Sequence, residues 1–161
     1  MKRRKTAGAG PPPLRGTVTV PGDKSISHRA LVFAALANGA STITGLNPGE
    51  DVGATADAVA ALGARVDRSD ENNVEVEGYG LDGLREPADV LDLGNSGTSM
   101  RTLLGVCAGI DGLAVLTGDE SLRSRPMLRV AAPLRQMGAT VDEFAFEAAG
   151  LKTWRADDAG R

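Results

Sequence analysis

An internal repeat constrains the fold of this 161-residue chain more than any other feature. Three short stretches recur in the same order, about 72 to 75 residues apart. Residues 20–31 align with 93–103, Thr44-Gly45 with Thr117-Gly118, and 62–66 with 137–141. Chance can supply one such match, but ordered matches with so little drift indicate two copies of one supersecondary unit.

Each copy has the pattern of a βαβαββ unit, which places the chain in the α/β (α+β) class. In the first copy, β-branched or alternating stretches predict strands at Thr17–Val20, Ser41–Thr44, Arg65–Asp67 and Val74–Glu77. An apolar run predicts a helix over residues 25–37 that is buried on every side. A second helix is expected between an N-cap at Asp51 and a stop at Gly63.

The repeat also predicts the domain organisation. We divide the chain into a disordered, solvated arm at 1–16, a first unit at 17–84 and a second unit at 85–161. In the second unit, Pro126 is expected to be the first residue of a helix and Pro133 to kink it. Beyond about Val141 the alternation is lost, so we expect an irregular or truncated end. Because one unit covers its sheet incompletely, we expect shared packing between units and a partner segment, such as a missing C-terminal half.

Composition excludes several classes of protein. The single cysteine, Cys107, and the single histidine, His28, leave no disulfide framework and no His/Cys cluster for a metal. A net charge of −3 argues against a nucleic-acid-binding protein, and no apolar run is long enough to span a membrane. The basic start of the chain has no apolar segment of the kind that a secretory signal contains, so we expect a cytoplasmic protein.

The first motif that could carry chemistry is PGDKSISHR at 21–29, between the first predicted strand and helix. A helix N-terminus presents unpaired N–H groups and partial positive charge. Lys24 and Arg29 add full charges, and Ser25 adds a hydroxyl donor. The motif therefore indicates a phosphate or carboxylate site. The alternative is that the serines only cap the helix and the cations are solvated.

Two further motifs have the same character. GNSGTSMR at 94–101 occupies the equivalent place in the second copy, where Gly97 would let a ligand approach the backbone. GDESLRSRP at 118–126 places Arg125 near the expected start of a helix. Taken singly, the motif at 94–101 is also consistent with a simple capped turn, and the motif at 118–126 with solvated arginines. Because every repeat-related turn has residues suited to binding an anion, we favour a functional role for these turns over a purely structural one.

Together, the stretches 21–30, 93–101 and 118–127 resemble the three N-terminal signatures of the 5-enolpyruvylshikimate-3-phosphate (EPSP) synthase family. The resemblance implies repeated βαβαββ units of the inside-out barrel type, here incomplete. It also implies transfer of the enolpyruvyl group of phosphoenolpyruvate to the 5-hydroxyl of shikimate 3-phosphate, with release of phosphate and without a metal or organic cofactor. This reaction belongs to the pathway to chorismate and aromatic amino acids.

The resemblance also implies roles for individual residues. Lys24 would contact phosphoenolpyruvate near the reacting centre and assist proton transfer. Together with Lys24, Ser25 and Arg29 would hold shikimate 3-phosphate. The phosphoenolpyruvate pocket, where the inhibitor glyphosate also binds, would be completed by Gly97 and Arg125, with Asp51 and Asn95 close to it.

The chain also departs from the family pattern. Family members are much longer, and the serine-serine-glutamine segment and the acidic base of the second lobe have no counterpart here. We therefore expect no turnover from this chain alone, and the alternative is a non-catalytic phosphate-ligand-binding fragment or one half of a split enzyme. The related transferase that acts on UDP-N-acetylglucosamine expects a Lys-Asn pair at Lys24-Ser25 and a reactive cysteine, whereas Cys107 lies in an apolar helix pattern. RNA-end-processing proteins of similar units are disfavoured by the acidic charge.

Overall fold

The computed structural model describes residues 15–70, 73–146 and 151–157. The first copy of the repeat forms two helices over a three-stranded antiparallel sheet of order β1-β3-β2. Its elements are α1 (Lys24–Leu36), β1 (Asn38–Thr44), α2 (Glu50–Ala61), β2 (Arg65–Asp67), β3 (Asn73–Tyr79) and the short 3-10 helix η1 (Leu81–Gly83). Gly63 ends the α2 segment at a φ of +116°, as predicted.

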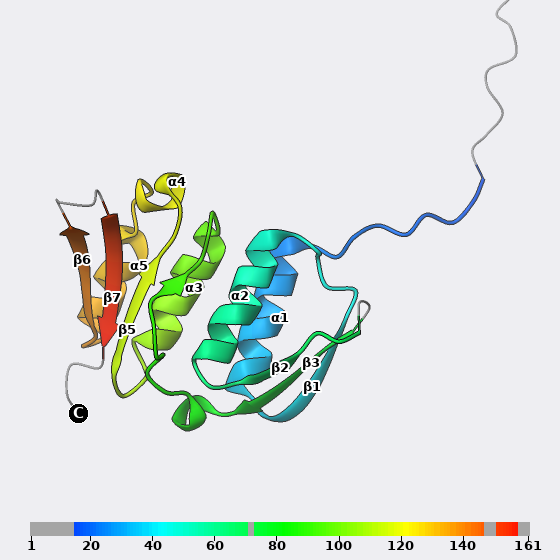
Figure 1. Ribbon diagram of the computed structural model, residues 1–161, viewed down its shortest axis with the longest axis horizontal. Helices are drawn as coiled ribbons and strands as arrows, with labels where there is room; N and C mark the ends of the chain where they lie inside the picture. Colours follow the sequence, from blue (N-terminus) through cyan, green and yellow to red (C-terminus); the bar gives the residue numbers. More distant parts are fainter. Residues whose placement is uncertain (1–14, 71–72, 147–150, 158–161) are drawn as a thin grey trace, which may run out of the picture.

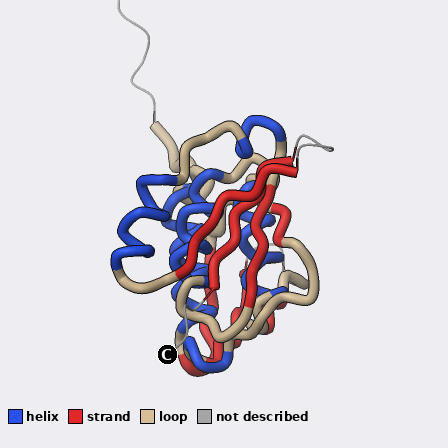
Figure 2. The backbone as a smooth tube through the Cα atoms, turned by 90° about the vertical axis from the view of Figure 1, so that its left-hand side faces the viewer, coloured by secondary structure: helices blue, strands red, loops and turns tan. Residues whose placement is uncertain are grey.

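The second copy forms a four-stranded sheet of order β4-β5-β7-β6. The β4 and β5 strands run parallel, and the other neighbours run antiparallel. Its elements are β4 (Leu91–Asp92), α3 (Gly97–Cys107), β5 (Leu113–Thr117), α4 (Glu120–Arg123), α5 (Leu128–Gln136), β6 (Thr140–Phe146) and β7 (Leu151–Asp157). Figure 2 views the molecule from the side of this sheet, whose strands cross it side by side.

The helices that open the two copies bury equivalent positions. Five side chains of α1 and five of α3 are almost completely excluded from solvent at the same repeat spacing; they are Ser27/Ser99, His28/Met100, Leu31/Leu103, Val32/Leu104 and Ala35/Cys107. A Cβ on Gly22 would lie 2.0 Å from the Gly45 carbonyl oxygen, and one on Gly118 would lie 2.4 Å from that of Gly94. The turn before the first helix therefore contacts the turn after the following strand in both copies, as the repeat predicts.

One continuous core joins the two copies. In Figure 1, α3 lies between β5 on one side and α2 on the other, and the first sheet covers α1 and α2. Leu31, Leu62, Leu103 and Leu116 are completely buried in this core. None of the helices in the described part of the chain has the length and apolar character that a membrane span requires.

The predicted strand at Thr17–Val20 is wrong. Residues 15–20 run away from the body of the protein as an extended arm (Figure 1), and Val18 and Val20 are 82% and 75% exposed. A strand needs a hydrogen-bonding neighbour, which β4 finds in β5 but this stretch does not find in the described chain. The predicted disordered arm lies outside the described residues as far as residue 14.

Three further expectations need correction. Glu50 and Asp51 lie inside the first turn of α2, whose N-cap is Gly49 rather than Asp51. Met127 precedes α5, so Pro126 is not a helical residue, although Pro133 does lie within the helix. The region expected to be irregular beyond Val141 contains β6 and β7, which pair along their whole length. The boundary predicted between residues 84 and 85 falls in the loop between η1 and β4 and stays a prediction.

Burial of α1 on every side is also wrong. Ile26 and Phe33 are 60% and 65% exposed on one flank of this helix. The apolar run at 30–37 therefore belongs to a helix with two apolar surfaces. The described chain covers one of them and leaves the surface with Ile26 and Phe33 open.

Candidate anion-binding site

The three long helices α1, α2 and α3 begin at the same end of the molecule, the upper end in Figure 1. Asp23 caps α1 by accepting from the Ile26 N–H at 2.7 Å, and Ser96 caps α3 by accepting from the Ser99 N–H at 3.2 Å. These caps satisfy one donor in each first turn and leave further N–H groups and the positive helix ends facing outward. The arrangement concentrates positive potential at this end.

Lys24 and Asp51 join the start of α1 to the start of α2 through an ion pair. The Lys24 side chain is 54% exposed and that of Asp51 is 22% exposed, so solvent screens the pair. The structure therefore places Asp51 beside Lys24, as a counter-ion for the predicted catalytic lysine. An incoming anion would compete with this carboxylate for the ammonium group.

Two guanidinium groups converge on the first residue of α3. A Cβ built on Gly97 would lie 2.8 Å from Nη1 of Arg101 and 2.9 Å from Nη1 of Arg125. Arg101 also donates from Nη1 to the Gly97 carbonyl oxygen at 3.1 Å. A side chain in this position would have to displace both guanidinium groups. Two like charges so close to a helix N-terminus repel each other unless an anion lies between them.

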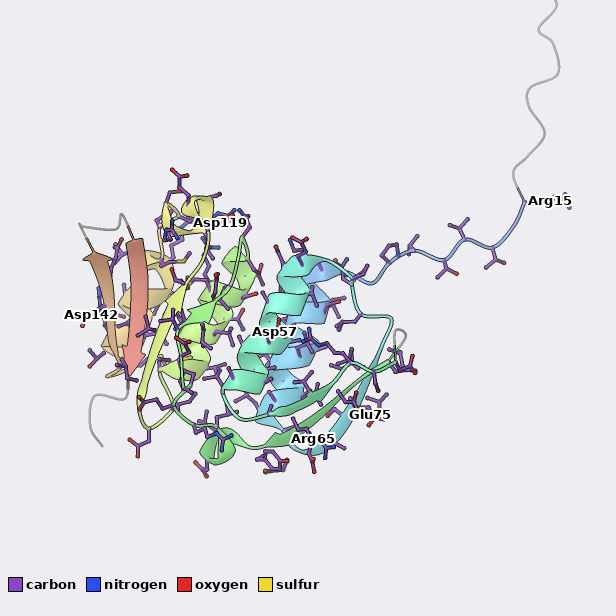
Figure 3. The ribbon with its side chains drawn as sticks, viewed as in Figure 1. Arg15, Asp57, Arg65, Glu75, Asp119 and Asp142 are labelled. Atoms are coloured by element: carbon purple, nitrogen blue, oxygen red, sulfur yellow. The ribbon has the colours of Figure 1, made fainter. Side chains whose placement is uncertain are left out.

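Arg125 is held in this position by Asn95 of the loop before α3 and by Ser121 of α4. Its Nη2 donates to Asn95 Oδ1 at 2.6 Å and to Ser121 Oγ at 3.3 Å. Asn95 in turn donates from Nδ2 to Asp119 Oδ2 at 2.6 Å. The Asn95 hydrogen bond, together with the Leu122 N–H, holds the pKa of the Asp119 carboxyl below its ordinary value. Figure 3 shows Asp119 at the same upper end of the molecule, beside the start of α3.

Ser25 and Arg29 lie exposed on the first two turns of α1. Within the described residues, no hydrogen bond or ion pair links either of them to the cluster around Gly97. The structure thus brings Gly97, Asn95 and Arg125 together and pairs Lys24 with Asp51. It leaves the predicted shikimate-3-phosphate ligands Ser25 and Arg29 on a neighbouring, open part of the same end.

A buried chain of polar side chains lies directly beneath these groups. His28 of α1, Thr55 of α2 and Ser99 of α3 are all completely buried. His28 Nδ1 lies 2.7 Å from Thr55 Oγ1, which lies 2.5 Å from Ser99 Oγ. The pKa of His28 is lowered, because burial outweighs the raising effect of nearby Asp51, and Lys24 lowers it further. The imidazole is therefore neutral at neutral pH.

Sequence reasoning missed Arg101 and the buried chain of His28, Thr55 and Ser99 as parts of this region. The signal for Arg101 was present, because the repeat aligns it with Arg29. The hydrogen-bonded set of His28, Thr55 and Ser99 has no comparable signal, because its members lie 27 and 44 residues apart in the sequence, farther than any local motif extends.

The described residues include no group of three or more His, Cys, Asp or Glu side chains placed to hold a metal ion. Cys107 is buried at the end of α3, and burial raises the pKa of its thiol to about 12. The thiol is therefore protonated at neutral pH and is neither a nucleophile nor a metal ligand there.

Comparisons with known proteins identify the family of this chain. A family model described as EPSP synthase (3-phosphoshikimate 1-carboxyvinyltransferase) matches residues 9–151. Relatives named 3-phosphoshikimate 1-carboxyvinyltransferase include those of Gloeobacter violaceus, 62% identical over 129 residues, and Pelotomaculum thermopropionicum, 58% identical over 129 residues. Each match covers 80% of this chain and 30% of the relative.

A solved structure of EPSP synthase from Acinetobacter baumannii superposes on this chain with a TM-score of 0.81 and 42% identity. The superposition covers 89% of this chain and 32% of that one. The chain thus spans about 30% of the length of the curated relatives it matches. Because the family model covers most of the chain, this protein belongs to the EPSP synthase family.

Proposed function

We propose that this chain supplies one side of the substrate site of an enolpyruvyl transferase. The complete site would transfer the enolpyruvyl group of phosphoenolpyruvate to the 5-hydroxyl of shikimate 3-phosphate and release phosphate. The observation that carries the proposal is the convergence of Arg101 and Arg125 on the N-terminus of α3 at Gly97. Such a pair of forked donors beside free N–H groups suits a carboxylate or phosphate of phosphoenolpyruvate.

Shikimate 3-phosphate would bind at the start of α1. Lys24, Ser25 and Arg29 present an ammonium, a hydroxyl and a guanidinium within the first two turns of this helix. Both substrates are anions and repel each other in water. Cations and helix N-termini arranged along one end of the protein offset this repulsion and hold the reacting atoms together.

In the proposed reaction, the 5-hydroxyl oxygen bonds to the enol carbon and loses its proton to a basic group of the complete site, while the neighbouring methylene carbon gains a proton. Loss of that proton and cleavage of the bond to the phosphate oxygen then restore the double bond. Lys24 would move the proton, and Asp51 would keep its ammonium group oriented in the absence of substrate. This chain's other cations would stabilise the departing phosphate.

A non-catalytic half-site is the second candidate, because the chain spans only about 30% of its relatives' length. The exposed flank of α1 at Ile26 and Phe33 supports a partner segment that completes the packing and the site. The cytoplasm remains our predicted location. Under either candidate the isolated chain binds shikimate 3-phosphate without releasing phosphate. The two candidates differ in whether the completed site releases it.

Calorimetric titration and a phosphate-release assay test these candidates. We expect saturable binding of shikimate 3-phosphate, loss of that binding in Arg29→Ala, and no steady-state release of phosphate from the isolated chain. Arg65→Ala is the matched control, because Arg65 lies on β2 at the opposite end of the molecule (Figure 3). Equal losses in both variants, or no binding by the unaltered chain, would contradict the proposal.

A further inference from the structure

We propose that His28 is a positioning residue that aligns the starts of α1, α2 and α3, and with them the anion-binding groups at this end. This inference rests on the proposed function, because the groups it aligns are the proposed substrate ligands. His28 itself is completely buried, so a ligand on the surface would not contact it. It would act only through the hydrogen bonds that it makes.

The geometry gives a continuous path between the three helices. His28 Nδ1 contacts Thr55 Oγ1 at 2.7 Å, and Thr55 Oγ1 contacts Ser99 Oγ at 2.5 Å. The Ser99 hydroxyl donates to Ser96 Oγ at 2.5 Å, and Ser96 is the residue that caps α3 directly before Gly97. A displacement of His28 is therefore transmitted through hydroxyl groups to the turn that carries Gly97.

The hydrogen-bond partners of the ring place the proton of its neutral form on Nδ1. His28 Nε2 is buried and has no hydrogen-bond partner in the described part of the chain. An N–H at Nε2 would be an orphaned buried donor, whereas a bare lone pair there costs less. With the proton on Nδ1, the ring donates to Thr55, which is free to donate onward to Ser99 or to the Asp51 carbonyl oxygen.

The repeat shows that packing alone does not require a histidine. The equivalent position in α3 is Met100, which is buried to the same extent. An unbranched thioether thus fills this place in the second copy without any hydrogen bond. A role in aligning α1 with α2 and α3 explains why the first copy has a histidine at this position, because the ring is hydrogen-bonded to hydroxyl groups on those two helices.

The charged groups that face the ring come from two helices. Lys24 lies on α1 and Asp51 on α2, and they form an ion pair with each other. The third helix, α3, presents the hydroxyls of Ser96 and Ser99. Among residues 15–70, 73–146 and 151–157, no group accepts a hydrogen bond from Nε2, so the aligned state contains the neutral ring.

Three substitutions at this position separate hydrogen bonding from packing. His28→Met copies Met100 and keeps the volume without the donor. His28→Asn places an amide N–H near the Nδ1 position, and His28→Gln places it nearer to Nε2. The probe is sulfate, added to the full 161-residue chain at neutral pH and followed through the amide signals of Ser25 and Gly97 by NMR.

We expect His28→Asn to bind sulfate within about twofold of the unaltered chain, and His28→Met and His28→Gln to bind about fivefold more weakly. Thermal unfolding should show that the Met variant remains folded. Because His28 is the only histidine, its ring nitrogen signals are unambiguous, and they should show a proton on Nδ1. Equal binding by the Met and Asn variants, or a proton on Nε2, would overturn the proposal.

A ligand-free comparison keeps the inference separate from the proposed site. If sulfate binds none of the proteins, the proposed site is wrong, and the alignment is judged from the Gly97 amide alone. We expect that signal to move in His28→Met and to stay in place in His28→Asn. A Gly97 signal that is unchanged in both variants would overturn the alignment role.

Discussion

The first helices of the two copies, α1 and α3, have the same buried positions but different surroundings. The α3 helix has α1 and α2 on one flank and α5 on the other, whereas one flank of α1 is open. The exposed Phe33 of α1 corresponds to Gly105 in α3, and exposed Ile26 corresponds to Thr98. Thr98 and Gly105 are exposed as well, so this side is open in both helices but carries large apolar side chains only in α1.

The two equivalent arginines show the same contrast. Arg101 is half-buried and donates to the Gly97 carbonyl oxygen beside Arg125. Arg29 is exposed on the open part of α1. The second copy therefore carries a preorganised pair of cations, while the first copy offers its cations on an open surface. Enclosure by neighbouring helices, rather than the motif itself, decides how well each cation is fixed.

The largest expected effect concerns how closely α1 lies on its sheet. A Cβ on Gly78 of β3 would lie 2.3 Å from the Ala34 carbonyl oxygen and 2.4 Å from that of Ala37. Because these are backbone atoms, Gly78→Ala should lower the free energy of unfolding by about 3 kcal/mol in urea titrations. Gly53→Ala in α2 is the control, since nothing lies within 4 Å of the new Cβ, and it should gain about 0.5 kcal/mol. Similar stabilities of the two variants would contradict the close packing.

The next effect concerns the cation pair of α3. Gly97→Ala should displace the flexible ends of Arg101 and Arg125 and weaken phosphoenolpyruvate binding about tenfold. Stability should change little, because the atoms that must move are side-chain ends. Gly105→Ala, on the exposed side of the same helix, should bind normally. Equal affinity of both variants in a calorimetric titration would show that the guanidinium groups do not hold the ligand.

A smaller effect distinguishes His28 from its counterpart Met100. Because the folded-state pKa of His28 is lowered, the unfolded chain binds the proton more readily below the ordinary value of 6.5. The free energy of unfolding should therefore fall as the pH drops from 6.5, and be fully retained above it. His28→Met should lack this part of the pH dependence in urea titrations. An unchanged pH profile would show that the ring titrates alike in both states.

The smallest effect concerns the open flank of α1. Phe33→Ser should change the free energy of unfolding by less than about 0.5 kcal/mol, because the ring is 65% exposed. Leu31→Ala, two residues earlier on the buried side, provides the contrast, because it should lower the free energy of unfolding by about 3 kcal/mol. A loss above about 1 kcal/mol in Phe33→Ser would mean that the flank is covered in solution, and the oligomeric state would then identify a second copy as the cover.

Much of the fold could be predicted because the repeat and the helix signals are local. The helix over 25–37 was placed within one residue, and Gly63 ended the next one as expected. The strand at Thr17–Val20 failed because β-propensity does not supply a pairing edge. The hairpin of β6 and β7 was missed since its register depends on the partner strand β5 rather than on alternation within each strand.

The candidate site could be predicted in part for the same reason. Gly97, Asn95 and Arg125 lie in short motifs with an interpretable anion-binding pattern, and the structure brings them together. The roles of Ser25 and Arg29 stay predictions. The contact of Asp51 with Lys24 and the buried path from His28 to Ser99 arise from packing between helices. No local pattern encodes such packing.

The most direct test of the central claim follows phosphoenolpyruvate by residue-resolved NMR on the full chain. We predict that the amide signals at the starts of α1 and α3 move together and saturate at one common dissociation constant, because Lys24 on α1 and Gly97 on α3 would both contact phosphoenolpyruvate. Shifts confined to one helix, or scattered over the outer faces of the two sheets, would contradict a shared site.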